Sequence, residues 1–453
     1  MRVGILTLGC DKNTVDNEYL AGLLSAAGCS VHSLLLDAPV PELDVVVATT
    51  CGFIADAKRQ SLEQLVALAE QKRATGFPRR IIAAGCLVQR YARDLLREIP
   101  EIDIAAGVGQ IEALAAWILE KNYDEQRNRT DPQPAVDMRR SLPRMPLDAA
   151  PYAYLRIADG CNHQCTFCAI PQMKGPLRSV PPQILLEEAH SLLARGAKEI
   201  NLIAQDITVY GKDLGKNYGL PQLLRDLCRI PGDFWVRCLY CYPGGVTDDL
   251  LETMASEPKI TPYLDMPLQH MDPEILRRMR RPFHDLDIPQ LVMRIRAAIP
   301  GIVLRTTMLV GFPGESAQAH RRMLDGMRAL AFERLGAFPF SKEEGTAAAL
   351  LPRQLRQAAI LKRWHAVMQT QALIAERFQQ QRIGAKIRVL IEGYDAERRA
   401  WRARSAAEAP EIDGNVYVHS DTTLSVGAFL TVEVNDAEIY DLFARPLTNT
   451  TTA

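Results

Sequence analysis

Six cysteines in two groups of three are the residues of this chain best suited to chemistry. Cys161, Cys165 and Cys168 form the first group, at C-x3-C-x2-C spacing just past a strand-like run over 152–158. Three thiolates this close suit a soft metal centre. Structural zinc and iron–sulfur clusters commonly take four protein ligands, so three predict a cluster with one iron open to another ligand. The alternative is a loop of buried thiols that binds no metal.

The second group is spread along the first hundred residues. Cys10, Cys51 and Cys86 each follow a predicted strand and stand next to a glycine. Because the carboxyl ends of parallel strands meet at one edge of a sheet, these cysteines are expected to converge there. We interpret them as a second three-thiolate cluster site. The alternative is three unrelated small apolar residues at strand ends.

Length and composition describe an ordinary globular protein. The chain has 453 residues, a formal net charge of -1, 47% hydrophobic and 24% charged residues. This length allows two or three domains, and the charge gives no global basic field for nucleic acid or for an anionic membrane. With no signal-peptide or membrane-spanning pattern, we expect a cytoplasmic protein, where clustered cysteines bind metal rather than form disulfides.

Alternating strand and helix patterns predict an open parallel α/β domain over residues 1–120. Strands are expected at 3–7, 31–35, 44–48, 81–84 and 102–105, and helices at 14–27, 55–72, 89–98 and 111–119. A polar stretch over 121–146 is rich in proline and arginine, and we interpret it as a linker of unassigned role.

Residues 147–379 alternate in the same way and predict six βα units, a partial barrel. Active residues in such barrels come from the carboxyl ends of the strands. Those ends offer Gln205, Arg305, Gly311 and Gly314 as cofactor contacts. Arg305 could instead make a salt bridge within the barrel, and the two glycines could be plain turn residues. His270 is interpreted as a hydrogen-bonded strand-end residue rather than a metal ligand.

Short β-rich runs over 380–446 predict a small antiparallel barrel. Acidic residues outnumber the basic ones there, which favours a basic protein over a phosphate backbone as partner. An ordinary solvated surface is the alternative.

These motifs together resemble the methylthiotransferases of the radical S-adenosylmethionine (SAM) superfamily. The resemblance covers almost the whole chain, and the terminal barrel is similar to that family's TRAM domain. It rests on the segments Leu8-Gly9-Cys10, Thr50-Cys51-Gly52, Gly85-Cys86-Leu87, Gly160-Cys161-Asn162, Gly311-Phe312-Pro313-Gly314 and Glu343-Glu344-Gly345-Thr346.

The resemblance implies an enzyme that uses two [4Fe-4S] clusters and SAM. The cluster on Cys161, Cys165 and Cys168 would bind SAM and supply the electron that generates a 5′-deoxyadenosyl radical. The cluster on Cys10, Cys51 and Cys86 would present sulfur, and a second SAM would supply the methyl group. The implied substrate is an aspartate of the twelfth small-subunit ribosomal protein, with an electron donor protein as a second partner. No side chain is assigned a catalytic role.

Two other functions stay open at this point. One is a tRNA adenosine methylthiotransferase of the same superfamily, against which the acidic terminal region argues. The other is a non-catalytic iron–sulfur or zinc scaffold that binds ribosomes. Contact with nucleic acid is possible but not expected to be primary, and no contact with a membrane is expected.

Overall fold

The computed structural model describes the chain except for residues 37, 39, 121–125, 132–137, 139–140, 216–217, 282–285 and 448–453. The predicted linker therefore lies partly outside the described residues. The chain divides into two compact units, each built from separate stretches of sequence. The first holds residues 1–149, 156–184 and 341–349, and the second holds 150–155, 185–340 and 350–453. The predicted boundaries at 120, 146 and 379 stay predictions.

The first unit is built around a parallel six-stranded sheet with the order β2-β1-β3-β4-β5-β6. Its strands are β1 Arg2–Thr7, β2 Ser30–Leu34, β3 Val45–Thr50, β4 Arg80–Gly85, β5 Ile102–Ala106 and β6 Asn128–Arg129. The helices between them are α1 Asp11–Ala26, α2 Ala55–Thr75, α3 Cys86–Glu98 and α4 Ile111–Leu119. This is the predicted α/β alternation, with one short edge strand more than expected.

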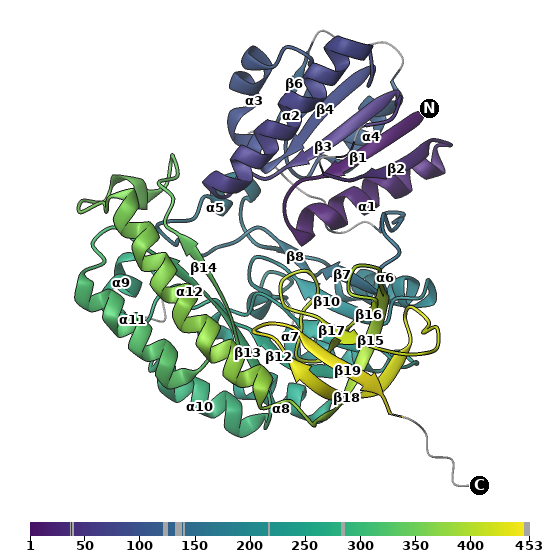
Figure 1. The fold of residues 1–453 in the computed structure, drawn as a ribbon. Helices are drawn as coiled ribbons and strands as arrows, with labels where there is room; N and C mark the ends of the chain where they lie inside the picture. Colours follow the sequence, from purple (N-terminus) through teal and green to yellow (C-terminus); the bar gives the residue numbers. More distant parts are fainter. Residues whose placement is uncertain are drawn as a thin grey trace. The chain divides into compact units, whose positions relative to one another are not determined.

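Helices cover both faces of this sheet (Figure 1). Leu65 of α2 and Leu95 of α3 pack on one face, while Leu24 of α1 and Ile118 of α4 pack on the other. A parallel sheet covered on both faces has nearly continuous apolar strands, which is why all six residues of β3 are buried. The carboxyl edge of the sheet carries its irregular loops.

Two later stretches complete the first unit. Residues 156–184 hold the three-cysteine loop, the helix α5 Ile170–Lys174 and the strands β8 Ala158–Asp159 and β9 Arg178–Ser179, which pair antiparallel. Residues 341–349 form a short segment that begins just after strand β14.

The second unit holds the six-stranded partial barrel expected from the sequence, with the sheet order β14-β13-β12-β11-β10-β7 (Figure 1). The strands are β7 Tyr152–Arg156, β10 Glu199–Ile203, β11 Trp235–Cys238, β12 Ile260–Asp265, β13 Val303–Val310 and β14 Arg334–Pro339. Its helices are α6 Pro182–Ala194, α7 Leu220–Cys228, α8 Asp248–Ser256, α9 Pro273–Arg278, α10 Ile288–Ala298, α11 Ala317–Leu330 and α12 Gln357–Gln380. No described helix is long and apolar enough to span a membrane.

A closed five-stranded barrel ends the chain, in the order β15-β16-β17-β19-β18. Its strands are β15 Lys386–Asp395, β16 Ala400–Ser405, β17 Val416–Val418, β18 Phe429–Ala437 and β19 Leu442–Pro446. The barrel is not wholly antiparallel, because β17 and β19 pair in parallel.

Residues 405–413 of this barrel, here called the acidic segment, face arginines and tyrosines of the six-stranded sheet. Glu408 accepts from Arg334 at 2.7 Å and also from Arg382, while Asp413 accepts from the Tyr263 hydroxyl at 2.6 Å. Glu411 accepts from the hydroxyls of Tyr152 and Tyr154. Much of the acidity that favoured a basic partner is therefore satisfied inside the second unit, and that charge argument is weaker than the sequence indicates.

Candidate metal centre

The first unit brings Cys10, Cys51 and Cys86 together at the carboxyl edge of its sheet. Cys10 is the N-cap of α1, Cys51 directly follows β3, and Cys86 is the first residue of α3. A Cβ atom on Gly9 would lie 3.1 Å from the Cys51 Cβ, and one on Gly52 would lie 2.8 Å from the carbonyl carbon of Cys86. Larger residues at these glycines would push the three loops apart.

The three thiols interact electrostatically. The pKa of Cys86 is raised to about 12, mainly by burial; Lys174 opposes this rise, and Cys10 and Cys51 add to it. Burial also raises the pKa of Cys51, an effect that an amide hydrogen bond from Phe53 opposes and the nearby Cys10 reinforces. Cys86 is buried, Cys51 is half-buried and Cys10 is exposed. Thiolates this close repel one another, and a cationic iron–sulfur core would stabilise all three together.

Cys161, Cys165 and Cys168 lie on a tight loop in the same unit. The backbone N–H groups of His163 and Ile170 each lie 3.4 Å from a sulfur, of Cys161 and Cys168 respectively. Amide hydrogen bonds to cysteine sulfur stabilise the thiolate and are among the controls of cluster potential. The β8–β9 pair closes the base of the loop, where the Cys161 N–H donates to the Gly175 carbonyl at 3.1 Å.

Helix α5 connects the two cysteine groups. It begins two residues after Cys168, and its Ile170 and Met173 pack with Cys86 and Val108 in one apolar cluster. Met173 is fully buried there. A short helix that contacts both groups fixes their separation within the unit.

The segment 341–349 adds residues that sequence reasoning missed. Glu343 accepts from Lys58 of α2 at 2.6 Å and from Arg90 of α3 at 3.1 Å. Gln172 of α5 donates to the Gly345 carbonyl at 2.6 Å. The Glu343-Glu344-Gly345-Thr346 motif was visible in the sequence, but nothing local indicated that it holds the helices beside both cysteine groups.

The donor set fits iron–sulfur clusters better than a single ion. Within the parts of the chain that the structure describes, no group of three or more His, Cys, Asp or Glu residues could hold a metal ion. Each group instead offers three cysteines outside any disulfide. Amide N–H groups lie near the sulfurs of Cys161 and Cys168, and the Phe53 amide hydrogen-bonds Cys51. Cysteine thiolates with amide donors are the usual ligands of iron–sulfur clusters.

Arg305 and the other residues predicted to contact a cofactor belong to the second unit. The Arg305 guanidinium donates to Asp265 at 2.9 Å, and its Nε lies 3.8 Å from Asp413. Burial alone would lower the pKa of Arg305, but Asp265, Tyr263 and Asp413 raise it. These contacts favour the barrel salt bridge over a carboxylate clamp for a ligand.

Gly311 and Gly314 have packing reasons to be glycine. Both have positive φ angles, 83° and 86°, and a Cβ on Gly311 would lie 2.6 Å from Ile360. The Gly311 N–H donates to Glu315 at 2.6 Å. The turn is thus accounted for by packing, and a role in binding a ligand stays a prediction.

His270 lies in the segment after β12, five residues past its last residue, and is fully buried. Its Nδ1 accepts from the Asp272 N–H at 2.9 Å, and its Nε2 lies 3.6 Å from Glu315. These contacts agree with the hydrogen-bonded strand-end interpretation.

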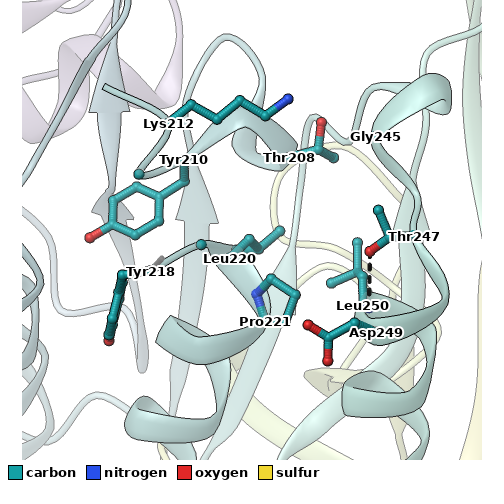
Figure 2. Close-up of a pocket in the computed structure, with 12 residues that line it drawn as sticks. Thr208, Tyr210, Lys212, Tyr218, Leu220, Pro221, Gly245, Thr247, Asp249 and Leu250 are labelled. Carbon is teal, nitrogen blue, oxygen red and sulfur yellow. Dashed lines mark hydrogen bonds between the residues drawn. The ribbon is translucent and has the colours of Figure 1, made fainter. Parts of the chain in front are cut away.

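Gln205 lies just past β10, at the carboxyl edge of the sheet, where a cavity of about 320 Å³ opens between the loops after β10 and β11. Figure 2 shows Tyr210, Lys212 and Asp249 among the side chains that line it. Gln205 itself does not line this cavity, so the cavity is not the predicted cofactor contact.

Two strained residues at the same edge were not predicted. Tyr240 and Gln269 follow β11 and β12 with φ angles of 63° and 74°, unusual for residues other than glycine. Backbone hydrogen bonds fix Gln269, whose N–H donates to Thr307 and whose carbonyl accepts from Leu309. Strain of this kind concentrates at functional sites, but sequence patterns carry no signal for it.

Family models match three parts of the chain. Residues 2–107 match an uncharacterized protein family, UPF0004; residues 155–325 match the radical SAM superfamily; and residues 383–447 match a TRAM domain. With the six-stranded partial barrel, these matches define a radical SAM enzyme, and the superfamily implies one [4Fe-4S] cluster and SAM.

Comparison with curated relatives shows which family of radical SAM enzymes the chain belongs to. The ribosomal protein uS12 methylthiotransferase RimO of Desulforudis audaxviator is 40% identical over 446 residues, covering 98% of this chain and 97% of its own. RimO of Geobacter sulfurreducens is 40% identical over 442 residues, covering 97% of each chain. The chain belongs to the RimO family of methylthiotransferases.

Solved structures of low identity share the fold. The radical SAM methyltransferase TsrM from Kitasatospora setae matches with a TM-score of 0.57 at 18% identity, over 75% of this chain and 74% of its own. The cobalamin-dependent radical SAM enzyme OxsB matches with a TM-score of 0.53 at 12% identity, over 80% of this chain and 56% of its own.

Proposed function

We propose that the protein attaches a methylthio group to the β-carbon of an aspartate in ribosomal protein uS12, using two [4Fe-4S] clusters and SAM. The observation that carries the proposal is the presence of two three-cysteine groups in one compact unit, connected by α5. One cluster site would suffice for radical cleavage of SAM, whereas sulfur transfer needs a second place to hold sulfur. The substrate is inferred from the names of relatives that span almost the whole chain.

Each cysteine group has a separate part in this proposal. Cys161, Cys165 and Cys168 would hold the cluster that binds SAM, and their amide hydrogen bonds would stabilise its thiolates. Cys10, Cys51 and Cys86 would hold the cluster that carries the sulfur to be transferred. When bound, these groups supply radical initiation and sulfur. The chain's own part is to fix their separation and to keep bulk water from Cys86, which is 8% exposed.

Gln205, Gly311 and Gly314 are proposed contacts for SAM at the carboxyl edge of the second unit's sheet. We also propose an electron donor protein as a partner, since reductive cleavage of SAM consumes an electron. We expect the enzyme to act in the cytoplasm, where its substrate is made.

Iron counting and product analysis test the proposal together. After anaerobic reconstitution we expect roughly eight irons per chain, and about half that number when Cys161, Cys165 and Cys168 are all replaced by alanine. The same is expected for alanine at Cys10, Cys51 and Cys86. Cys228→Ala and Cys238→Ala, at buried cysteines outside both groups, are the matched controls and should retain all the iron.

Mass spectrometry of uS12 then identifies the reaction. With reductant and SAM, the wild-type chain should add one methylthio group to an aspartate of uS12, and either triple variant should add none. Methylthiolation of tRNA alone would contradict the proposed substrate. Full iron loading without formation of 5′-deoxyadenosine would indicate a scaffold rather than an enzyme.

A further inference from the structure

The loops that carry Cys10, Cys51 and Cys86 leave the parallel sheet at the ends of its paired strands. The pairing of β1 with β3 extends as far as the Leu8 N–H, which donates to the Thr49 carbonyl at 2.8 Å. All three cysteines lie past the last paired residues of their strands. The relative positions of the cysteines therefore depend on contacts other than the backbone hydrogen bonds of the sheet.

Asn13, the third residue of α1, connects the loops of Cys10 and Cys51. Its side-chain amide nitrogen donates to the Leu8 carbonyl at 3.0 Å and, more weakly, to the Thr50 carbonyl at 3.4 Å. These carbonyls lie two residues before Cys10 and one residue before Cys51. Asn13 is only 5% exposed, and a buried amide is normally hydrogen-bonded because its desolvation is otherwise uncompensated. One amide group thus holds two of the three loops.

Thr50 extends this connection to the third loop. Its hydroxyl donates to the Ala84 carbonyl at 2.7 Å, and the residue is fully buried. Ala84 belongs to β4 and lies two residues before Cys86. Thr50 therefore accepts a hydrogen bond from Asn13 through its carbonyl and donates one to β4 through its hydroxyl. These hydrogen bonds link the bases of all three cysteine loops.

Two glycines leave the space that these hydrogen bonds need. A Cβ on Gly9 would lie 2.7 Å from the amide nitrogen of Asn13, and a Cβ on Gly85 would lie 2.7 Å from the carbonyl oxygen of Thr50. Contacts this short would displace the amide and the carbonyl. Each glycine directly precedes a cysteine of the group, so the loops and the hydrogen bonds beneath them fit together.

We propose that Asn13 and Thr50 form a hydrogen-bonded connection, here called the Asn13–Thr50 bridge, that sets the spacing of Cys10, Cys51 and Cys86 before a cluster binds. Ligands that folding has already placed need no further ordering when the metal binds, so the affinity is higher. Replacing residues that hold metal ligands in position typically lowers metal affinity by roughly 10–100-fold. The inference rests on the proposed function, because it requires a cluster at these cysteines. Both residues act through the cysteine loops and are positioning residues.

Competition for iron with a chelator tests the role of the Thr50 hydroxyl. The parent for all variants carries alanine at Cys161, Cys165 and Cys168, so only the cluster on the other three cysteines is measured. Circular dichroism checks that each variant is folded. Thr50→Val keeps the size of the side chain and removes the hydroxyl, so the apparent affinity for iron should fall about tenfold. Thr50→Ser keeps the hydroxyl and should retain the affinity of the parent.

A packing role for Thr50 would give the opposite order, because valine fills the space of threonine and serine does not. Asn13→Ala removes both hydrogen bonds of the amide and should lower the affinity for iron at least as much as Thr50→Val. If Asn13→Ala does not fold, the comparison of Thr50→Val with Thr50→Ser still decides between the two roles.

Thr306→Val is the matched control in the second unit. The Thr306 hydroxyl donates to the Met266 carbonyl on the neighbouring chain segment at 2.9 Å, and the residue is fully buried, as Thr50 is. The substitution therefore removes the same kind of hydrogen bond without altering the loops of the three cysteines. It should leave the affinity for iron unchanged.

Four outcomes would overturn the inference. The affinity of the parent in folded Thr50→Val or in folded Asn13→Ala would show that the bridge does not position the ligands. Equal losses in Thr50→Ser and Thr50→Val would show that the hydroxyl is not the cause. An equal loss in Thr306→Val would indicate a general effect of removing a buried hydroxyl. A parent that takes up no iron would overturn the proposed second cluster as well, and the iron content of the parent distinguishes this result from the others.

Discussion

Replacing Gly311 would have different effects depending on whether this glycine is needed for packing or for binding SAM. Its φ of +83° is costly for any residue with a Cβ, by about 1–2 kcal/mol, and the Cβ would also lie 2.6 Å from Ile360. We therefore expect Gly311→Ala to lower the free energy of unfolding by about 1–2 kcal/mol or more, even without SAM. Urea denaturation of the wild type and the variant, both without SAM, measures this difference in the free energy of unfolding.

Gly336→Ala is the matched control for this experiment. Gly336 has no positive φ, and its Cβ would meet only Arg305, at an ordinary 3.5 Å. The Gly336→Ala substitution should therefore change the free energy of unfolding little. A Gly311→Ala variant that is as stable as the wild type but binds SAM poorly would contradict the packing explanation and favour a cofactor contact.

Individual site residues differ in how far the sequence could predict them. Cys161, Cys165 and Cys168 are close because they are neighbours in the chain, so their spacing was enough. Cys10, Cys51 and Cys86 needed the further rule that parallel strands end at one edge. Glu343 could not be predicted as a site residue, because its contacts with Lys58 and Arg90 join segments that are more than 250 residues apart in the chain.

Among the elements, the acidic segment 405–413 shows what composition cannot reveal. The count of acidic residues in the terminal barrel was correct, but the count does not say which carboxylates face solvent. Arg334, the partner of Glu408, lies 74 residues earlier in the chain, and Arg305 lies still farther from Asp413. Pairings at this range depend on the tertiary structure, and no local pattern encodes them.

Glu408 in this segment gives the protein a predictable response to acid. Burial alone would raise the pKa of Glu408, but Arg382 and Arg334 lower it to about 2, below the ordinary 4.5. A carboxyl with a depressed pKa in the folded state stabilises the fold above its unfolded pKa, and this stability is lost as the pH falls through the folded value. We expect Glu408→Gln to cost roughly 3 kcal/mol at pH 7.

The pH dependence separates this effect from a packing defect. The difference in free energy of unfolding between wild type and Glu408→Gln should shrink as the pH falls from about 5 towards 2. Denaturation at several pH values measures the difference. Glu438→Gln, at an exposed residue whose ion pair with Arg398 is loose at 3.5 Å, should change little at any pH. A difference that stays constant with pH would rule out the charge as its source.

At the scale of the whole molecule, the second unit depends on its last seventy residues. Arg334, 3% exposed in its side chain, has Glu408 of the acidic segment as its carboxylate partner. A chain that ends at residue 380 leaves this buried charge without a partner, which costs roughly 3–5 kcal/mol for a broken buried pair. We expect this truncated chain to lose cooperative thermal unfolding, measured by calorimetry.

A chain that ends at residue 447 is the control. It retains β19 and the acidic segment, and we expect it to unfold like the full-length protein. Adding Arg334→Met to the shorter truncation should restore part of the lost stability, since the unpaired charge is then absent. A stable, cooperative chain ending at 380 would mean that the acidic segment is dispensable for the sheet.

Strand and helix order was predictable over most of the chain, because buried parallel strands and amphipathic helices have distinct apolar patterns. The strands β1 to β5 appear where the patterns indicate them, and the partial barrel has the expected six strands. The assignment of chain segments to the two units was not predictable from the sequence. It depends on contacts such as that of Glu343 with Lys58, which join segments 285 residues apart.

The discontinuous first unit has a consequence for synthesis of the protein. The chain passes between the units at 149–150, 155–156, 184–185, 340–341 and 349–350, so the first unit lacks one of its parts until residue 349 has been made. Its six-stranded sheet and three of its cysteines leave the ribosome more than two hundred residues earlier. Iron delivered during that interval would meet Cys10, Cys51 and Cys86 without the Glu343 contacts. We therefore expect the proposed clusters to be loaded only after residue 349 has been made.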